Sequence, residues 1–443
     1  MTYFFETYGC EMNKAESASI EHLFINRNWK AAKNAQEAKF VVINTCSVRA
    51  TAETRILGRL GWYTALRRQR QDSFVLVVTG CMAERLKDDF KKNFPVIDYV
   101  VGTFQKQSFL DIIDAIEQNR KLEKIDEEPI YTFAPLSYEI GEFRAYVPIM
   151  HGCNNFCTYC IVPYVRGREV SRSPKEILEE LSQLSYHKVK EVTLLGQNVN
   201  SYRFNDDDGN EIDFPILMKM IANHLKNIKS SIGWIRFMSS HPKDLSEKLI
   251  DVIAEEKIFC RHIHLPVQHG SSKILEAMNR KYTREQYLDL VKMIRKKIPE
   301  ITLTTDVMVG FPGETEEDFE KTVSLFNEVS YESAFMYYFN PREGTKAFSM
   351  TNQIPMKTKK ARLSKIIDLQ LKNTKTEMQK RIGNIVTVLV ETISRDNKNE
   401  LLGRTEKNAH VVFEADSSLI GNFVKVQLKE LNGNTFRGII VKE

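Results

Sequence analysis

Six of the seven cysteines in this chain fall into two groups of three, and both groups are typical of iron–sulfur chemistry. The compact group is Cys153-x-x-x-Cys157-x-x-Cys160, which follows an apolar segment at residues 146–150. Three thiolates on one loop bind three irons of a 4Fe-4S cluster and leave the fourth iron open to a chelating substrate. The alternative is a zinc site with His151 as fourth ligand, although zinc ligands usually come as separated pairs.

The dispersed group is Cys10, Cys46 and Cys81, which are separated by 36 and then 35 residues. Each follows an apolar segment by three to five residues, and the loops after parallel strands gather at one edge of a sheet. The spacing therefore predicts a second cluster site. The alternative is three buried structural cysteines, a common environment for this residue. Cys260 belongs to neither group and is interpreted as a core thiol.

The composition fits a globular protein of two to four domains, with 443 residues, 42% hydrophobic and 27% charged. No apolar run is long enough to cross a bilayer, and the early apolar run at residues 3–5 leaves no room for a signal peptide, so we expect a cytoplasmic protein. A disulfide framework is not expected with so few cysteines in so long a chain. The net charge of +5 is informative only where basic residues cluster, at residues 67–70 and 357–362, and a solvated helix face is the simpler interpretation of both.

Three regions differ in their pattern of apolar residues. Residues 1–119 alternate apolar strands (40–43, 74–78 and 99–101) with helices, the last ending near residue 119, which predicts a parallel α/β sheet. A charged linker is expected at 120–140. Residues 141–372 repeat the strand–helix order six times, which predicts a partial parallel (β/α) barrel. The expected strands there are 146–150, 191–195, 234–237, 262–265, 302–309 and 334–338.

Helix starts in the barrel region carry capping signals. Ser173 with Glu176, and Thr283 with Gln286, each predict a capping box. A long helix at 357–379 leads into residues 373–443, where five short strands predict a small all-β barrel of the oligonucleotide-binding kind. These strands are expected at 385–391, 401–405, 411–413, 423–428 and 435–441.

Several motifs surround the cysteines and the barrel strands. They are TYGCEMN (7–13), NTCSVR (44–49), GCMA (80–83), GCNNFCTYCIVPYVRGRE (152–169), LLGQNVNSY (194–202), SSHP (239–242) and TDVMVGFPGETEEDF (305–319). With these motifs the chain resembles the methylthiotransferase family of radical S-adenosylmethionine enzymes over essentially its whole length, and within it the MiaB type. Glu11 and His269 depart from the family, which usually has glutamine and serine there, and Glu11 adds a carboxylate beside Cys10.

The resemblance implies a fold and a reaction. The fold would be an N-terminal methylthiotransferase domain, a radical S-adenosylmethionine barrel and a C-terminal TRAM domain. One S-adenosylmethionine would methylate a sulfur on the auxiliary cluster. A second would be cleaved at the radical cluster, and the resulting 5′-deoxyadenosyl radical would take hydrogen from C2 of N6-isopentenyladenosine beside the anticodon.

The resemblance also assigns residues. It implies Cys10, Cys46 and Cys81 as ligands of an auxiliary 4Fe-4S cluster, and Cys153, Cys157 and Cys160 as ligands of the radical cluster. The residues expected to line the S-adenosylmethionine pocket are Tyr159, Gly196, Gln197, Ser239 and Gly310.

The implied partners are a tRNA anticodon stem-loop carrying N6-isopentenyladenosine, an electron donor of flavodoxin or ferredoxin type, and a sulfur-delivery system. Arg404, Lys407 and Arg437 in the C-terminal region are the expected RNA contacts. Two alternatives stay open. One is a methylthiotransferase for another tRNA adenosine or for a ribosomal protein, and the other is a non-catalytic RNA-binding protein with structural zinc.

Overall fold

The computed structural model describes residues 1–47, 50–70, 73–126 and 131–441, and the chain divides into two compact units. The first comprises Met1–Asn154, Cys160–His187 and Leu194–Gln197. The second comprises Asn155–Tyr159, Lys188–Thr193 and Asn198–Glu443. Val48 and Arg49 of the NTCSVR motif, and residues 127–130 of the expected linker, lie outside the described residues.

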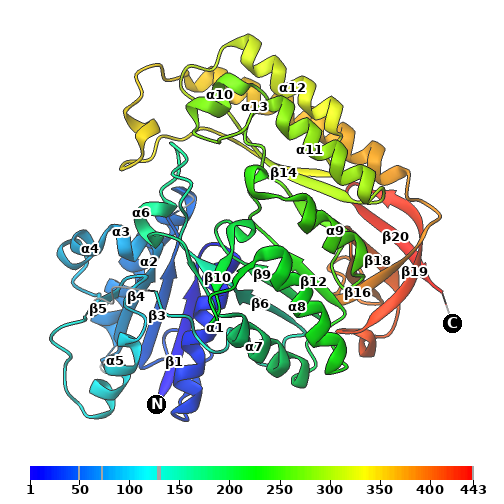
Figure 1. The fold of residues 1–443 in the computed structure, drawn as a ribbon. Helices are drawn as coiled ribbons and strands as arrows, with labels where there is room; N and C mark the ends of the chain where they lie inside the picture. The colour runs from blue at the N-terminus through cyan, green and yellow to red at the C-terminus, as the bar shows by residue number, and fades with distance from the viewer. Residues whose placement is uncertain (48–49, 71–72, 127–130, 442–443) are drawn as a thin grey trace. The chain divides into compact units, whose positions relative to one another are not determined.

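The first unit is built on a five-stranded parallel sheet with the order β2-β1-β3-β4-β5 (Figure 1). This is the flavodoxin-like order, in which the winding of the chain reverses between β1 and β3. The strands are β1 (Thr2–Thr7), β2 (Lys30–Ala31), β3 (Phe40–Thr45), β4 (Val75–Gly80) and β5 (Tyr99–Val101). The helices among them are α1 (Glu11–Asn26), α2 (Ala50–Gln69), α3 (Cys81–Arg85), α4 (Lys87–Asn93) and α5 (Ser108–Glu117).

Helices cover both faces of this sheet, and its strands are continuously apolar for that reason. Val41 and Ile43 of β3 pack with Leu60 of α2 on one face. Val42 points to the opposite face and packs with Phe24 of α1, because successive side chains of a strand alternate. The strands expected at 40–43, 74–78 and 99–101 are confirmed.

The remainder of the first unit contains the strands and helices around the compact cysteine group. They are β6 (Arg144–Pro148), β7 (Met150–His151), β8 (Val170–Ser171), α6 (Val162–Arg166) and α7 (Pro174–Tyr186). The predicted capping box at Ser173 is wrong. Ser173 is the N-cap residue of α7, but its side chain caps no backbone N–H of the helix. Glu176 accepts instead from Arg172 Nε at 3.3 Å, so an ion pair takes the place of the box.

The described part of the expected linker contains neither helix nor strand between α5 and β6. It is not solvated throughout, because Tyr131, Ser137 and Tyr138 are buried. Residues 131–137 and helices α1 and α5 together line a cavity of about 460 Å³ within the first unit.

The second unit contains the later strand–helix repeats, and β13, β14 and β15 form a parallel sheet. Strand β9 (Glu191–Leu195) is divided between the two units. The strands wholly in the second unit are β10 (Arg203–Asn205), β11 (Glu211–Asp213), β12 (Trp234–Phe237), β13 (His262–His264), β14 (Thr302–Val309) and β15 (Ser333–Tyr338). The helices are α8 (Phe214–Asn227), α9 (Glu247–Glu255), α10 (Ser272–Ala277), α11 (Arg284–Lys297), α12 (Glu316–Val329) and α13 (Met356–Gln379).

The capping box predicted in the second unit is present, unlike the one predicted in the first. The box predicted at Thr283 and Gln286 is present at the start of α11. A second box, which was not predicted, begins α12 with Thr315 and Asp318. The six expected barrel strands are all present, with shifts of one or two residues at some ends.

The last five strands close into a small barrel with the order β16-β17-β18-β20-β19, drawn in orange and red in Figure 1. Its core is apolar and includes Val388, Val411 and Phe436. The strands are β16 (Ile385–Ile393), β17 (Glu400–Thr405), β18 (His410–Glu414), β19 (Phe423–Asn432) and β20 (Thr435–Ile440). The predicted all-β C-terminal barrel is therefore confirmed.

The basic clusters are not simple solvated faces. Lys359 and Arg362 on α13 are buried, and Lys359 Nζ donates to Phe339 O at 2.9 Å. Arg67 on α2 is half-buried and pairs with Asp98 at 2.6 Å. Lys359 and Arg67 therefore bond to residues of their own units. Within the described ranges, every helix is too short or too polar to cross a bilayer.

Candidate functional site

The three dispersed cysteines each follow a strand of the first unit's sheet. Cys10 is the N-cap residue of α1 after β1, Cys46 follows the last residue of β3, and Cys81 begins α3 directly after β4. In a flavodoxin-like sheet the crevice at the carboxyl ends of β1 and β3 is the usual ligand site. The topology therefore places the three thiols where such a fold binds its ligand.

The loops that carry Cys10 and Cys46 approach each other closely. Gly9 has a φ of +131°, and a Cβ atom added there would lie 2.7 Å from Cys46 Cβ and 3.2 Å from Cys46 Sγ. Only glycine allows this approach. Cys46 and Cys81 are buried, whereas Cys10 is exposed, so the group opens to solvent on the Cys10 side.

Two asparagines of the cysteine motifs hold these loops together. Asn13 Nδ2 donates to Thr45 O at 2.9 Å, and Asn44 Nδ2 donates to Asn13 O at 2.9 Å. Cys10 Sγ lies 3.5 Å from Asn13 Oδ1 as its hydrogen-bond donor. The first turn of α1, next to Cys10, is thereby fastened to the end of β3, next to Cys46, by buried side chains.

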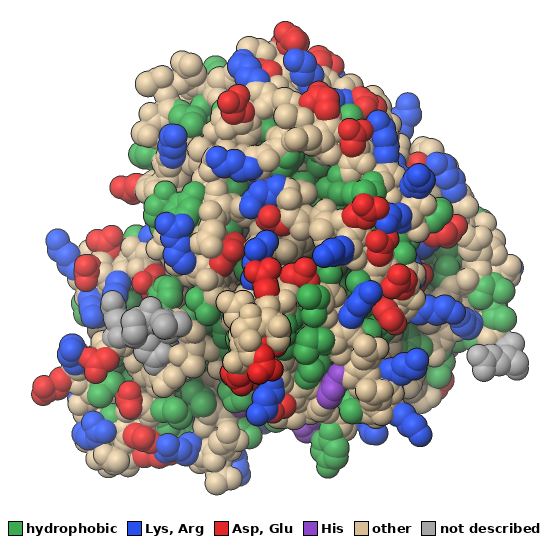
Figure 2. Space-filling view, viewed as in Figure 1, with side chains coloured by type: hydrophobic (Ala, Val, Ile, Leu, Met, Phe, Trp, Pro, Cys, Tyr) green, Lys and Arg blue, Asp and Glu red, His purple; other side chains and the backbone are tan. Residues whose placement is uncertain are grey.

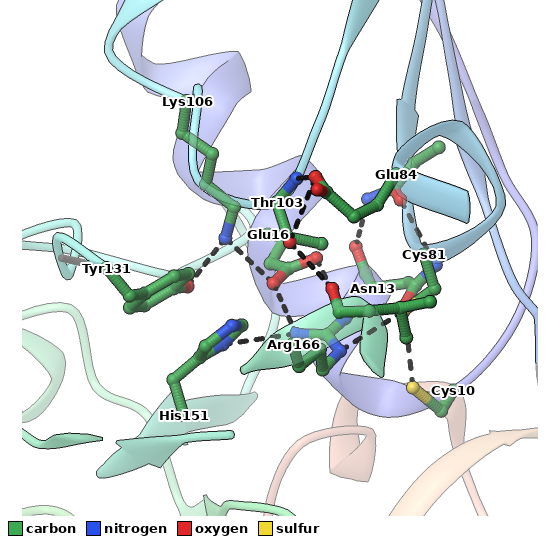
Figure 3. Close-up of polar contacts among 12 residues, drawn as sticks. Cys10, Asn13, Glu16, Cys81, Glu84, Thr103, Lys106, Tyr131, His151 and Arg166 are labelled. Carbon is green, nitrogen blue, oxygen red and sulfur yellow. Dashed lines mark hydrogen bonds and ion pairs between the residues drawn. The ribbon is translucent and has the colours of Figure 1, made fainter. Parts of the chain in front are cut away.

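A buried arginine reaches the same group from α6. Arg166 Nε donates to Cys81 Sγ at 3.2 Å, and its two terminal nitrogens donate to Glu16 at 2.8 Å and to Asn13 Oδ1 at 3.3 Å (Figure 3). Val165 of the same helix packs against Cys81. Helix α6 thus supplies both an apolar and a cationic neighbour to one thiol.

The network continues away from the cysteines through Glu16. Lys106 Nζ lies 2.7 Å from Glu16 and donates to Tyr131 Oη at 2.6 Å. Tyr131 stacks on His151 with 3.5 Å between ring centroids, and His151 Nδ1 lies 3.3 Å from Arg166. Figure 3 shows Lys106, Glu16 and Arg166 as a row that leads to Cys81.

The burial of these groups controls their protonation. Burial alone would raise the pKa of Glu16, but Arg166 and Lys106 hold it well below its usual range. Burial lowers the pKa of His151 well below its usual value, and both cations lower it further, so the ring is neutral at neutral pH. Burial raises the pKa of the Cys81 thiol to about 11; Arg166 acts to lower it, while Glu16, Cys10 and Cys46 raise it further.

The compact cysteine group is divided by the boundary between the units. Cys153 and Cys160 belong to the first unit, where Cys153 N donates to Gly167 O at 3.1 Å. Cys157 belongs to the second unit, where Arg280 donates to its sulfur at 3.4 Å. Thr158 N donates to Met278 O at 3.1 Å, which fixes the Cys157 loop beside the end of α10.

The donor geometry bears on the zinc alternative. Among the described residues no group of three or more His, Cys, Asp or Glu side chains is arranged to hold a single metal ion. His151 faces Tyr131 and Arg166. In a 4Fe-4S cluster each thiolate binds a different iron, whereas the ligands of a zinc site share one ion.

The expected cofactor-pocket residues lie in both units. In the second unit, Tyr159 packs against the apolar cluster around Phe311, and Ser239 has a φ of +68°. Gly310 has a φ of +72°, and a Cβ there would lie 2.4 Å from Lys359 Cγ, so glycine is required. In the first unit, Gly196 and Gln197 follow β9.

Buried polar atoms at two of these motifs lack partners. Gln197 Oε1 in the first unit has no hydrogen-bond partner among the described residues. The same holds in the second unit for Ser240 Oγ and His241 Nε2, both in the SSHP motif. Such groups are rare in folded proteins, and each needs a partner such as a water, an ion or a polar ligand. The two unpartnered atoms of the second unit, Ser240 Oγ and His241 Nε2, fit the polar amino, carboxylate and ribose groups of S-adenosylmethionine.

The three expected RNA contacts form ion pairs within the second unit. Arg404 lies 3.0 Å from both Glu191 and Glu391, and Lys407 lies 2.8 Å from Glu300. Arg437 pairs with Glu400. These carboxylates offset the three charges. On the face shown in Figure 2, basic and acidic side chains are likewise interspersed.

The two departures from the family pattern have local roles. The Glu11 side chain is 37% exposed, and its carboxylate lies 3.4 Å from Lys14 Nζ. His269 is buried, and its Nδ1 accepts from Ser271 N at 3.0 Å. Cys260 is buried, as expected for a core thiol, and burial raises its pKa to about 12.

Comparison with known proteins accounts for most of the chain. The radical SAM superfamily matches residues 147–326, the uncharacterized protein family UPF0004 matches residues 2–102, and the TRAM domain matches residues 379–441. The tRNA-2-methylthio-N(6)-dimethylallyladenosine synthase of Treponema denticola is 52% identical over 99% of both chains. The chain belongs to the family of these synthases. They are radical S-adenosylmethionine methylthiotransferases, as the sequence motifs indicated.

Other relatives and solved structures agree. The synthase of Bacteroides thetaiotaomicron is 44% identical over 98% of this chain and 95% of its own. The radical S-adenosylmethionine methyltransferase TsrM from Kitasatospora setae, solved with cobalamin and a [4Fe-4S] cluster, shares the fold with a TM-score of 0.60 and 14% identity over 78% of this chain and 77% of its own. The cobalamin-dependent S-adenosylmethionine radical enzyme OxsB matches with a TM-score of 0.52 and 12% identity over 98% of this chain and 65% of its own. At these identities the likeness concerns the fold alone.

The charged residues around the cysteines were not predicted from the sequence. Arg166 lies within the GCNNFCTYCIVPYVRGRE motif, but its partner Glu16 is 150 positions earlier, and Lys106, which also pairs with Glu16, is 60 positions earlier. Arg280 is likewise 123 positions from Cys157. For Arg166 the local signal is a charged residue at the end of the short apolar helix α6, and this does not identify its partner.

Proposed function

We propose that the chain adds a methylthio group to C2 of N6-isopentenyladenosine beside the anticodon of tRNA, in the cytoplasm. The single observation that carries this proposal is the identity of 52% over 99% of both chains to a synthase named for that nucleoside. The gathering of three thiols at the carboxyl ends of β1, β3 and β4 supports a second cluster beside the radical one.

In this proposal each group of three cysteines holds one 4Fe-4S cluster. Cys10, Cys46 and Cys81 would hold the auxiliary cluster, and Cys153, Cys157 and Cys160 the radical cluster. When bound, the radical cluster would supply reductive cleavage of one S-adenosylmethionine, and the auxiliary cluster would supply the sulfur that a second one methylates. The net change replaces the C2–H bond of the base with a C2–S bond that carries a methyl group.

The chain's own residues position the reactants. Tyr159, Gly196, Gln197, Ser239 and Gly310 would line the S-adenosylmethionine pocket. Burial of the surrounding polar groups excludes water. A radical intermediate requires this exclusion. An electron donor of flavodoxin or ferredoxin type and a sulfur-delivery system would serve the two clusters.

The C-terminal barrel would bind the RNA backbone. Arg404, Lys407 and Arg437 already pair with carboxylates, so a contact by any of them would exchange a carboxylate for a phosphate. Because the exchange replaces one ion pair by another, these contacts would contribute modestly to affinity.

The test is a reaction with defined RNA. Anaerobically purified and reconstituted protein is incubated with hypomodified tRNA, S-adenosylmethionine and a reductant, and the nucleosides are analysed by mass spectrometry. A mass increase at N6-isopentenyladenosine supports the proposal. Modification of another adenosine, or of a ribosomal protein under the same conditions, would replace it. Colourless protein that holds zinc and no iron would support the non-catalytic alternative instead.

A further inference from the structure

The two cysteine groups share a feature that the family comparison does not assign. In each group one sulfur accepts a hydrogen bond from a buried guanidinium. Arg166 Nε lies 3.2 Å from Cys81 Sγ in the first unit, and Arg280 lies 3.4 Å from Cys157 Sγ in the second. Only 2% of Arg166 and 5% of Arg280 is exposed, so neither charge is hydrated.

The charge around Arg166 is not balanced by its carboxylate. Glu16 is shared by two buried cations, because it pairs with Arg166 at 2.8 Å and with Lys106 at 2.7 Å. Two positive charges against one negative charge leave an excess of one positive charge in this row. A buried charge is costly unless an opposite charge lies beside it. The two terminal nitrogens of Arg166 bond to Glu16, and its Nε donates to Cys81 Sγ.

Arg280 is even less compensated. Its Nε donates to Tyr282 Oη at 3.1 Å and its second terminal nitrogen donates to Pro266 O at 2.9 Å, both neutral acceptors. In the part of the chain that the structure describes, no carboxylate forms an ion pair with Arg280. The remaining hydrogen-bond partner is the sulfur of Cys157, which would be an anionic thiolate as an iron ligand.

An iron–sulfur cluster at each site would supply the negative charge that Arg166 and Arg280 lack. Three thiolates more than offset the positive charge of the cubane core, so a cluster held by three cysteines is an anion. Hydrogen bonds to cluster sulfurs stabilise the reduced form most, because reduction adds further negative charge. A cation in hydrogen-bond contact with a ligand sulfur therefore raises the reduction potential.

We propose that Arg166 and Arg280 are positioning residues, each dedicated to one cluster: Arg166 holds the Cys81 ligand of the auxiliary cluster, and Arg280 holds the Cys157 ligand of the radical cluster. The inference rests on the proposed function, since it requires two clusters. It adds that each cluster has its own guanidinium, so that the potentials of the two clusters are set separately.

The test examines each cluster alone in the full-length chain. Replacing Cys153, Cys157 and Cys160 by alanine leaves the auxiliary site, and replacing Cys10, Cys46 and Cys81 by alanine leaves the radical site. In each background Arg166→Gln, Arg280→Gln and the charge-preserving Arg166→Lys and Arg280→Lys are compared. The readouts are iron and sulfide per chain, the electron paramagnetic resonance spectrum of the reduced cluster, and its midpoint potential.

We expect each glutamine variant to change the potential of one cluster only. Arg280→Gln lowers the potential of the radical cluster, with about a tenfold smaller reduced-to-oxidised ratio at fixed solution potential, equivalent to ~59 mV for one electron. It leaves the auxiliary cluster unchanged. Arg166→Gln lowers the potential of the auxiliary cluster and leaves the radical cluster unchanged. Each lysine variant recovers part of the corresponding shift. Should a glutamine variant lose its cluster altogether, selective loss with the other site still filled supports the same assignment.

A matched control separates this role from general packing. Arg236 is a buried arginine of the second unit that pairs with Glu191 at 2.7 Å and has no cluster cysteine among its bonded partners. Arg236→Gln should leave both potentials unchanged. The inference is overturned if both clusters respond alike to each arginine variant, if neither responds, or if Arg236→Gln has the same effect. Wild-type protein with iron for only one cluster would refute the two-cluster function itself, a result distinct from these.

Discussion

Arg166 Nε donates to Cys81 Sγ across 3.2 Å, although 85 positions separate the two residues in the chain. The contact joins α6, which follows the compact cysteine group in sequence, to the first residue of α3. It links the compact cysteine motif to the dispersed cysteine group through a side chain that belongs to neither set of proposed ligands.

The close approach at Gly9 can be tested by adding one methyl group. In Gly9→Ala the new Cβ would lie 2.7 Å from Cys46 Cβ, so the loop carrying Cys46 must shift. We expect iron per chain to fall from about eight to about four, because only the dispersed group loses its cluster. Gly141→Ala is the matched control, since Gly141 also has a positive φ, +91°, but nothing lies within 4 Å of its added Cβ. Equal iron loss in both variants would contradict the prediction.

Glu16 should be important for stability because it compensates two buried cations. Glu16→Gln leaves Arg166 and Lys106 without a carboxylate, and we expect a loss of about 3–5 kcal/mol in the free energy of unfolding. Lys106→Met in the same chain should recover part of this loss, which denaturant titration will measure. Glu11→Gln, which removes a solvent-accessible ion pair on the same helix, should cost about 0–1 kcal/mol. A Glu16→Gln variant as stable as Glu11→Gln would show that the row of charges is not stabilising.

Ser240 should bind ligand without contributing to stability. Its buried Oγ has no partner among the described residues, so Ser240→Ala should leave the free energy of unfolding unchanged or raise it by about 1 kcal/mol. The same variant should weaken S-adenosylmethionine binding by about tenfold in calorimetric titration. Ser246→Ala is the opposite case, because Ser246 accepts from Leu249 N at the start of α9. It should cost about 1 kcal/mol and leave binding unchanged. Unaltered binding in Ser240→Ala would count against a ligand at this atom.

Asp318 should make the stability of the second unit depend on pH. Burial alone would raise its pKa, but hydrogen bonds from Ser271, Thr315 and Lys273 hold it well below its usual range. The unfolded chain thus binds a proton that the folded chain does not. The stabilisation is complete above the ordinary carboxyl pKa of about 4 and is lost as the pH falls toward the folded value.

The variant Asp318→Asn tests this linkage. At pH 7 we expect it to lower the free energy of unfolding by about 1–3 kcal/mol. The difference from wild type should narrow when urea titrations are repeated at pH 3, because the wild-type carboxylate then loses its advantage. A difference that stays constant between pH 7 and pH 3 would assign the effect to packing.

Arg437 provides the clearest test of RNA contact, because 44% of its side chain is exposed, more than for Arg404 or Lys407. Arg437→Glu should reduce the slope of log affinity for tRNA against log salt by about one, the effect of one lost phosphate contact. Lys292→Glu is the control, an exposed cation on α11 that pairs with Asp289. An unchanged slope for Arg437→Glu would remove this residue from the RNA interface.

Much of the fold follows from local pattern. Val41, Val42 and Ile43 are apolar in succession because both faces of their strand are covered, and that pattern is legible without coordinates. Thr283 and Gln286 form the capping box that their spacing predicts. Ser173 and Glu176 have the same spacing and do not, because Arg172 captures the carboxylate. The competing residue is itself local, because Arg172 precedes Glu176 by four positions.

The sequence by itself determined the chemistry of this protein: which residues are thiols, how they are spaced, and that the dispersed thiols follow strands. Spacing suffices there because parallel strands place their carboxyl ends at one edge whatever the intervening helices contain. Only the tertiary structure decided which charges meet those thiols. Arg166 contacts Glu16 and Arg280 contacts Cys157 across 150 and 123 positions. Such pairs are selected by the cost of burying an uncompensated charge, which exists only once the chain has folded.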